Sequence, residues 1–231
     1  MKLSVIIPVY NEASTIRQVL ERINAAPLPP GMEREIVAVN DGSSDGSEKV
    51  LEELRAEGLI QALHSEKQNR GKGYALRQGF KEATGDYLII QDADLEYQPE
   101  DFGRLLEPVL SGKAEVVYGS RFWGDAKGMS LAHNLGNRLL SWTNFLLFGR
   151  YLSDPYTCYK LIPVPVAKGL GLVSDGFEIE AEITAKLQKK GLKLVEVPIT
   201  YRGREFSQGK KIKKWDGFLG VVNFVRFRLG G

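Results

Sequence analysis

Cysteine and histidine are scarce in this chain of 231 residues, which has one cysteine, Cys158, and two histidines, His64 and His133. A single cysteine excludes an internal disulfide framework and is typical of a protein from a reducing compartment. With so few soft ligands, a zinc site built from cysteine and histidine is not expected either. The two histidines are interpreted as ordinary surface or packing residues.

Long apolar runs and a strong net charge are also missing. No stretch approaches the roughly 18 uncharged apolar residues of a membrane-spanning helix, and the apolar run at residues 3–10 lacks the cleavage site of a signal peptide. The chain has 31 Lys and Arg against 29 Asp and Glu, a net charge of +2, which gives no general affinity for nucleic acid. We therefore expect a cytoplasmic protein without a nucleic-acid partner.

The near-neutral total conceals a basic segment at the C-terminal end. Residues 202–228 have a net charge of +6, which leaves −4 for the rest, and four lysines (Lys210, Lys211, Lys213 and Lys214) precede the apolar stretch 215–229. The stretch 131–148 is likewise apolar on almost every side, as helices are when they are deeply buried or touch lipid. Basic residues beside an apolar helix suit an anionic membrane surface. The alternative is that both helices pack on the sheet and that the lysines are simply solvated.

The first two-thirds of the chain alternates between two hydrophobic periods. Short β-rich apolar runs at residues 3–10, 35–40, 60–64, 86–91 and 115–119 alternate with helical patterns at 14–24, 47–57, 72–83 and 99–110. This alternation predicts an α/β fold with a mostly parallel central sheet flanked by helices. Beyond Arg121 we expect a loop at 122–129, helices at 131–148, 177–190 and 215–229, and a strand at 193–201. The whole chain, 1–231, is interpreted as a single domain.

Polar clusters follow three of the predicted strands. They are Pro8-Val9-Tyr10-Asn11-Glu12, Asp41-Gly42-Ser43-Ser44-Asp45 and Asp92-Ala93-Asp94-Leu95-Glu96. Such residues favour turns, so each cluster alone has a purely structural explanation. Because ligands of open α/β sheets bind outside the carboxyl ends of the strands, three clusters at one predicted edge favour a binding site.

The third cluster is the most informative of these. Asp92 and Asp94 lie in a loop, where both carboxylates can reach one cation, and Glu96 is a candidate third ligand. Oxygen ligands suit Mg²⁺ or Mn²⁺, which proteins hold with one or two carboxylates together with substrate phosphates. The sequence therefore predicts a phosphorylated ligand.

Two common phosphate motifs are excluded. No GxxxxGK[ST] sequence is present, and Gly71-Lys72-Gly73 is not a dinucleotide loop because Leu76 occupies the third glycine position. Lys72, at a predicted helix start, is expected to contact phosphate instead.

Taken in order, these segments closely resemble the motifs of family-2 glycosyltransferases with the GT-A fold. The matching segments are VIIPVYNE, VNDGSSDGS, NRGKGYAL, DYLIIQDADLEYQPED and YGSR. The later DPYTCYKLIP, GFEIEAEITAKL and YRGREFSQGKKIKKWDG resemble the subgroup of dolichol-phosphate mannosyltransferases and bacterial polyprenyl-phosphate glycosyltransferases. The resemblance runs from Leu3 to about Phe227.

The resemblance implies a Rossmann-like domain with apolar C-terminal helices, in which residues 1–121 bind the nucleotide sugar and residues 122–231 form the acceptor side. It assigns the base and ribose to Pro8, Tyr10, Glu12, Val39 and Asp41, the diphosphate and metal to Asp92, Ala93 and Asp94, the acceptor phosphate to Arg121, and the donor diphosphate to Arg204 and Lys210. Glu96 stands where dolichol-phosphate mannosyltransferases usually have Gln, and Gln208 stands where the bacterial subgroup often has Glu.

The implied activity is an inverting transfer of mannose or glucose, from GDP-mannose or UDP-glucose, to a polyprenyl or dolichyl phosphate at the cytoplasmic face of a membrane. A metal on Asp92 and Asp94, together with Arg204 and Lys210, would lie where negative charge grows on the leaving diphosphate, and the expected catalytic residues are Asp94 and Arg121. A lipid phosphate, with a second pKa of about 6, needs no base. A hydroxyl acceptor, which is the main alternative, needs one, and Asp154 is the candidate unless it only forms an Asp-Pro turn. A nucleotide-sugar-binding module without turnover is a further alternative, and no oligomeric state is indicated.

Overall fold

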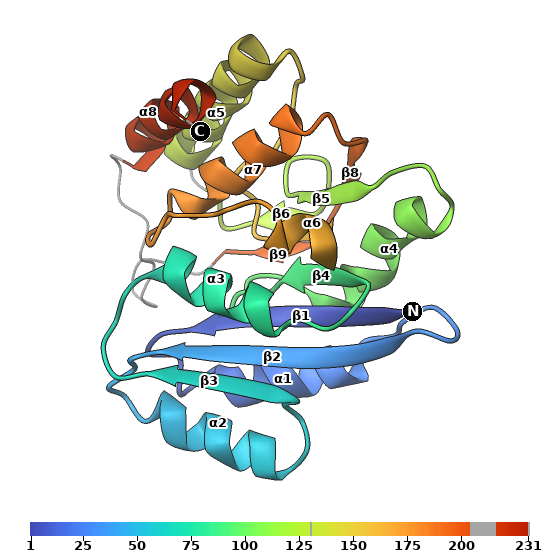
Figure 1. The fold of residues 1–231 in the computed structure, drawn as a ribbon, viewed down its shortest axis with the longest axis vertical. Coiled ribbons are helices and arrows are strands. Elements are labelled where there is room, and N and C mark those ends of the chain that lie inside the picture. Colours follow the sequence, from blue (N-terminus) through green and yellow to red (C-terminus); the bar gives the residue numbers. More distant parts are fainter. Residues whose placement is uncertain (130, 204–215, 231) are drawn as a thin grey trace.

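A seven-stranded sheet forms the centre of the computed structural model, which describes residues 1–129, 131–203 and 216–230 (Figure 1). Its strand order is β3-β2-β1-β4-β7-β5-β8. Strand β7 runs antiparallel to both neighbours, β4 and β5, and the other neighbouring strands are parallel. The strands are β1 (Lys2–Val9), β2 (Glu33–Asp41), β3 (Ala62–Glu66), β4 (Tyr87–Ile90), β5 (Val116–Ser120), β7 (Lys160–Pro163) and β8 (Leu194–Pro198), and β6 (Ala126–Lys127) pairs with β9 (Tyr201–Arg202) in a second small sheet.

Helices lie on both sides of this sheet, and the first of them buries a single apolar stripe. In α1 (Ile16–Ala25) the buried residues Ile16, Val19, Leu20 and Ile23 follow the i, i+3, i+4, i+7 spacing that places side chains on one helix face. Strand β1 is buried on both faces, as expected for a parallel strand covered on each side. The remaining helices are α2 (Ser47–Ala56), α3 (Lys72–Glu82), the short 3₁₀ helix η1 (Pro99–Asp101), α4 (Phe102–Leu110), α5 (Leu131–Phe148), α6 (Val164–Lys168), α7 (Ile179–Lys189) and α8 (Asp216–Leu229).

The strand order reverses beside β1. From β1 the chain moves outward through α1 to β2 and through α2 to β3, and α3 then returns it to β4 on the other side of β1. Because such crossovers are right-handed, α1 and α2 lie on one face of the sheet and α3 on the opposite face. The loops after β1 and β4 therefore leave the sheet in different directions, and a crevice opens between them at the carboxyl ends of the strands.

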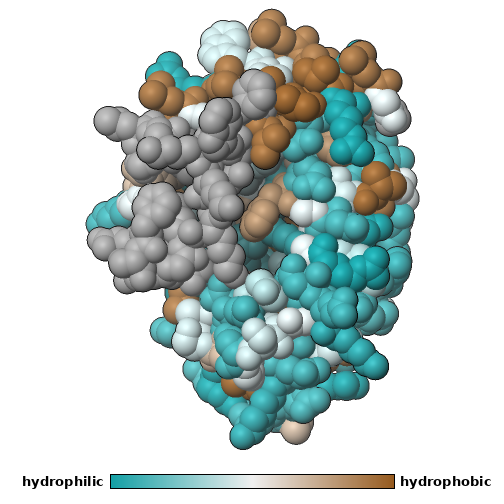
Figure 2. All heavy atoms as spheres, turned by 90° about the vertical axis from the view of Figure 1, so that its left-hand side faces the viewer, coloured by the Kyte–Doolittle hydropathy of each residue, from teal (hydrophilic) through white to brown (hydrophobic). Residues whose placement is uncertain are grey.

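A second, smaller core lies away from the sheet, where α5, α7 and α8 meet. Its buried members are Leu140, Ala181, Ala185, Phe224 and Phe227. The outer sides of α5 and α8 carry exposed apolar residues, which gather at one end of the molecule (Figure 2). Within the described ranges, no helix combines the length and the apolar character needed to cross a bilayer.

The predicted fold class is confirmed: the sheet is mostly parallel and flanked by helices. The expected helices at 131–148 and 177–190 appear as α5 and α7. Besides β6, two elements were not predicted, β7 and α6, because Lys160–Lys168 contains two prolines and is too short to show a period. The predicted strand at 193–201 is divided into β8 and β9, and the predicted loop at 122–129 contains β6.

Candidate active site

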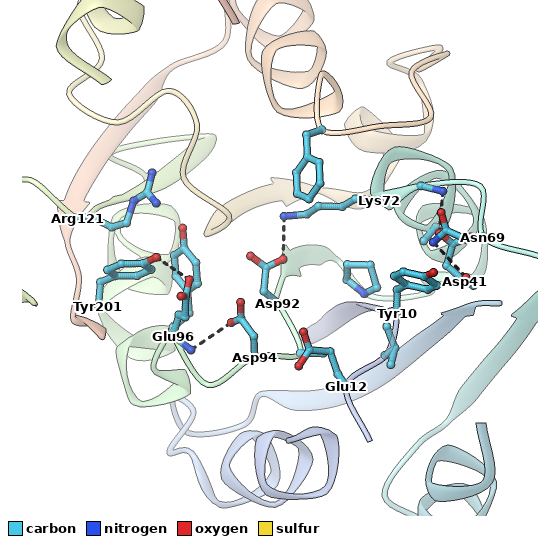
Figure 3. A pocket seen from close by; sticks show the side chains of 17 residues that line it. Tyr10, Glu12, Asp41, Asn69, Lys72, Asp92, Asp94, Glu96, Arg121 and Tyr201 are labelled. Atoms are coloured by element: carbon cyan, nitrogen blue, oxygen red, sulfur yellow. Dashed lines mark hydrogen bonds and ion pairs between the residues drawn. The ribbon is translucent and has the colours of Figure 1, made fainter. Parts of the chain in front are cut away.

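A cavity of about 330 Å³ opens at the carboxyl ends of β1, β2 and β4 (Figure 3). Its walls come from the segments that follow these strands, from the first turns of α3, and from single residues of the later chain. The lining residues are Pro8, Val9, Tyr10, Glu12, Asp41, Asn69, Gly71, Lys72, Ala75, Asp92, Ala93, Asp94, Glu96, Tyr97, Arg121, Phe177 and Tyr201. The three polar clusters of the sequence thus meet at one cavity.

Two residues assigned from sequence, Val39 and Asp154, do not line this cavity. Val39 is completely buried within β2, and its side chain lies near Gly79 of α3. Asp154 is also completely buried. Arg204 and Lys210, together with the rest of the basic segment 210–214, lie outside the described residues.

Asp41 fixes the loop that leads into α3. Its Oδ1 accepts a hydrogen bond from the Arg70 amide at 2.9 Å, and its Oδ2 accepts from the Gly71 amide at 2.7 Å and from Asn69 Nδ2 at 2.9 Å. Gly71 has a φ of +105°, and a Cβ atom there would lie 2.4 Å from the Asp175 carbonyl oxygen. Only glycine fits this position without strain. The loop therefore places the next residue, Lys72, at the cavity wall.

The loops after β1 and β4 are tied together at the floor of the cavity. Thr15 Oγ1 lies 2.9 Å from Glu12 Oε2 and 2.8 Å from the Ala93 carbonyl oxygen. The Glu12 amide donates to Ser47 Oγ at 2.9 Å, which also connects the start of α2. Leu95 has a φ of +63°, an uncommon conformation for a branched apolar residue. Such backbone strain is found most often at functional sites.

Asp92 and Asp94 face the same space from the loop after β4 (Figure 3). Asp92 Oδ1 lies 2.8 Å from the Lys72 ammonium, and Asp94 Oδ1 accepts from the Glu96 amide at 3.2 Å. Burial raises the pKa of Asp92, but the charge and hydrogen bond of Lys72, together with Cys158 and Arg121, outweigh burial, so that the pKa lies below its ordinary value. Burial likewise opposes the charge of Lys72, yet the carboxylates around it raise its pKa well above the ordinary value. Both groups are therefore charged at neutral pH.

The donor set around Asp92 and Asp94 fits a hard divalent cation. Among the residues that the structure describes, no group of three His, Cys, Asp or Glu side chains is placed to hold a metal. The carboxylate of Glu96, the predicted third ligand, accepts a hydrogen bond from the Tyr201 hydroxyl at 2.6 Å. Two carboxylates leave the remaining coordination positions to phosphate and water, an arrangement that Mg²⁺ commonly adopts.

Arg121 reaches the cavity from the end of β5 and is held by Asp154. Its Nε and Nη2 lie 2.7 and 2.8 Å from the two Asp154 oxygens, and its backbone amide donates to Asp154 Oδ2 at 3.1 Å. Arg121 is 6% exposed and Asp154 0%. Burial would lower the pKa of Arg121, but Asp154 raises it well above its ordinary value. Both carboxylate oxygens of Asp154 are thus directed toward Arg121.

An aromatic cluster lies beside Arg121, and the sequence prediction did not identify it. The Tyr97 ring lies 4.8 Å from that of Tyr159 and 5.2 Å from that of Tyr201, and the Arg121 guanidinium lies 5.2 Å from the centroid of Tyr201. Asn69, Gly71, Phe177 and Tyr201 occur within the recognised segments NRGKGYAL, GFEIEAEITAKL and YRGREFSQGKKIKKWDG, so these motifs contained a usable signal.

Comparisons with known proteins identify the family of this chain. The model of the family described as "Glycosyl transferase family 2" matches residues 4–166. A dolichol-phosphate mannosyltransferase of Pyrococcus furiosus is 31% identical, over 100% of this chain and 68% of the relative. A UDP-N-acetylglucosamine–dolichyl-phosphate N-acetylglucosaminyltransferase of Methanococcus voltae is 28% identical over 97% of this chain and 95% of the relative.

Among solved structures, glucosyl-3-phosphoglycerate synthase from Mycobacterium tuberculosis, in complex with Mn²⁺, UDP and glucosyl-3-phosphoglycerate, superposes with a TM-score of 0.70. It is 22% identical, and the match covers 99% of this chain and 80% of that protein. This likeness concerns the fold. The family match and the identity to the archaeal relative together show that this chain belongs to glycosyl transferase family 2.

Proposed function

We propose that this enzyme is an inverting, metal-dependent hexosyltransferase that moves mannose or glucose from a nucleotide diphosphate sugar to a polyprenyl or dolichyl phosphate. The observation that carries the proposal is the composition of the cavity. Two carboxylates, Asp92 and Asp94, lie on its donor side, and a buried guanidinium, Arg121, lies on its other side.

The donor is assigned to the walls that come from β1, β2 and β4. Pro8, Tyr10, Glu12 and Asp41 lie where the nucleoside would bind, with Val39 beneath them in β2. Asp92, Ala93 and Asp94 would hold the diphosphate and Mg²⁺ or Mn²⁺, and Arg204 and Lys210 are proposed to contact the diphosphate as well. A bound divalent cation would supply fixed positive charge at the leaving diphosphate.

Arg121 is the proposed contact for the acceptor phosphate. A lipid phosphate is already ionised near neutral pH and needs a cation to position it, not a base to activate it. Arg121 satisfies this requirement, since Asp154 keeps it charged and fixed at the cavity wall. A hydroxyl acceptor would need a general base, and Asp154, the candidate for that role, is directed toward Arg121. The lipid-phosphate acceptor is therefore the better supported alternative.

A membrane surface is the proposed location of the acceptor. On the outer side of α5, Leu146 is 78% exposed, Leu135 67% and Trp142 54%, and on α8 Leu219 is 53% exposed. Arginines 138, 226 and 228 lie exposed on the same two helices. Apolar side chains beside basic ones suit the interface of a membrane with anionic lipids. The same pattern supports peripheral association with the cytoplasmic face, and the names of the archaeal relatives include dolichyl-phosphate acceptors.

The direct test is transfer of radiolabel into an organic phase. The enzyme is incubated with Mn²⁺, undecaprenyl or dolichyl phosphate, and labelled GDP-mannose or UDP-glucose. UDP-N-acetylglucosamine is included because the relative from Methanococcus voltae bears that name. We expect one donor to give labelled lipid. The matched acceptor is the corresponding polyprenol, which lacks the phosphate. Label that remains aqueous with every donor, or that enters polyprenol equally well, would refute the lipid-phosphate assignment.

A further inference from the structure

Four charged side chains of alternating sign form a row that leads from the cavity into the interior. The Lys72 ammonium lies 2.8 Å from Asp92 Oδ1 and 3.1 Å from Glu180 Oε1, and Glu180 Oε2 in turn pairs with the ammonium of Lys160. The four residues come from the loop after β4 and from α3, α7 and β7. Side-chain exposure falls along the row from 23% at Asp92 and 13% at Lys72 to 4% at Glu180 and 0% at Lys160.

The inner half of the row has no direct part in the proposed transfer. Glu180 and Lys160 do not line the cavity. Buried charges are expensive unless they are paired, and Lys160 has two partners, Glu180 and the Thr157 carbonyl oxygen. Glu180 Oε1 is different, because it is buried and accepts no hydrogen bond although the Lys72 ammonium is 3.1 Å away. This oxygen already lies at ion-pair distance from the Lys72 ammonium without a hydrogen bond, so it can take up that cation more fully.

A divalent cation on Asp92 conflicts with Lys72 in its present position. Lys72 already contacts one oxygen of Asp92, so a second, doubly charged cation on that carboxylate would lie close to the ammonium and repel it. Lysine is a point charge on a flexible stem, and its ammonium reaches a neighbouring acceptor by rotation of the side chain alone. Glu180 Oε1 is such an acceptor, and a donor diphosphate in the cavity is another.

We propose that Lys72 is a placeholder cation, which neutralises Asp92 while no metal is bound and moves to Glu180 or to the donor diphosphate when a divalent cation takes Asp92. Glu180 and Lys160 are then positioning residues, since Lys160 holds Glu180 where it can receive the ammonium. As a consequence, the metal binds weakly alone and tightly together with a diphosphate. The inference rests on the proposed metal-dependent use of this cavity, but not on the identity of the sugar or the acceptor.

The test is a Mn²⁺ titration of the intact protein, followed by electron paramagnetic resonance of free Mn²⁺, without donor or lipid. Lys72→Met keeps the length of the side chain and removes its charge, and it is expected to tighten Mn²⁺ binding about tenfold. The double variant Lys160→Met with Glu180→Gln leaves the net charge unchanged and removes the carboxylate that would receive the Lys72 ammonium. Lys72 then stays on Asp92, and Mn²⁺ binding should weaken about threefold. Lys81→Met, on the exposed side of the same helix α3, should have no effect.

The second part of the test adds UDP or GDP to the Mn²⁺-saturated protein. There Lys72→Met should weaken nucleotide diphosphate binding, the opposite sign to its effect on Mn²⁺ alone. Unchanged or weaker Mn²⁺ binding by Lys72→Met would overturn the placeholder role, and unchanged or tighter binding by the double variant would overturn the role of Glu180. If the double variant does not fold, Glu180→Gln alone answers the same question, because Lys160 retains the Thr157 carbonyl. Failure of sugar transfer to lipid would leave these titrations unaffected, so the two proposals fail separately.

Discussion

Replacing Asp154 with asparagine tests whether this residue holds Arg121 or acts as a base. The substitution keeps the shape of the side chain and removes its charge, which leaves the Arg121 guanidinium buried at 6% exposure without a counter-ion. Removing one partner of a buried ion pair lowers the free energy of unfolding by about 3–5 kcal/mol, because the other charge stays buried without compensation. For a chain of this length, such a loss lowers the melting temperature by roughly 6–20 °C.

Urea unfolding followed by circular dichroism measures this loss, and a double-mutant cycle isolates the pair. We expect the loss for Arg121→Met with Asp154→Asn to be smaller than the sum of the single losses by about 2–3 kcal/mol. The matched control is the exposed pair of Arg17 and Glu57, 3.0 Å apart with side chains 40% and 47% exposed. There Glu57→Gln should cost at most about 1 kcal/mol.

The same variants separate the two roles of Asp154. If Asp154→Asn is within about 1 kcal/mol of the wild-type stability and the cycle shows no coupling, the positioning role is refuted. If this stable variant has also lost transfer to a hydroxyl acceptor, Asp154 is the general base and the lipid-phosphate assignment loses its main support. We expect the opposite result, in which stability falls, and activity falls with it because Arg121 is no longer fixed.

Three further predictions concern the metal, the membrane and acid stability. Asp94→Asn should abolish the Mn²⁺-dependent part of the thermal shift given by a nucleotide sugar, where the wild type gains about 2.7 kcal/mol at a ligand concentration of 100 Kd; an unchanged shift would reject the metal assignment. Leu146→Glu, at a position 78% exposed on α5, should reduce co-sedimentation with anionic vesicles without changing the melting temperature, and undiminished binding would exclude this face. Burial raises the pKa of Glu35, but hydrogen bonds from Ser4 and from the Thr84 amide and hydroxyl bring it below its ordinary value. Because the pKa is depressed in the folded state, Glu35 contributes stability above its ordinary pKa, and this contribution is lost as the pH falls through the folded value. Glu35→Gln should therefore flatten the fall in melting temperature between about pH 5 and pH 3, whereas the exposed Glu33→Gln on the same strand should not; equal slopes for both would contradict this account.

The fold was predictable as far as each element could be recognised from its own residues. The alternation of apolar strands and amphipathic helices predicts β1 to β5 and α1 to α4, because the packing of those elements is encoded in local periods. Strand β7 was missed since its four residues, KLIP, contain a lysine and a proline, and it becomes a strand only by pairing with β4 and β5 on either side. Its lysine, Lys160, is buried by a partner twenty residues away, Glu180, and no local pattern predicts that contact.

The site was predictable in its residue types and less so in their pairings. Strand ends placed Asp41, Asp92 and Asp94 at one edge, because parallel strands direct their carboxyl ends to the same side. The partners of these residues were not predictable: Lys72 contacts Asp92, and Asp41 binds the amides of the loop at residues 69–71. Ion pairs between distant segments depend on the three-dimensional packing, so a motif identifies charged residues without showing which charges neutralise one another.

Helix α3, at which the strand order reverses, also sets the charge beside Asp92 in the candidate site. Helix α3 must return from β3 across β2 and β1 to reach β4, and it therefore starts at the carboxyl edge of the sheet, beside the crevice. Asp41 at the end of β2 holds the first residues of α3 through the Gly71 amide, and the backbone of Gly71 approaches that of Asp175 closely. In this position of the helix, the Lys72 ammonium contacts Asp92. The loop at residues 69–71 thus controls the electrostatics of the site through the position of Lys72. Under the proposed function, the crossover helix contributes to the switch point through the cation that it places there, Lys72.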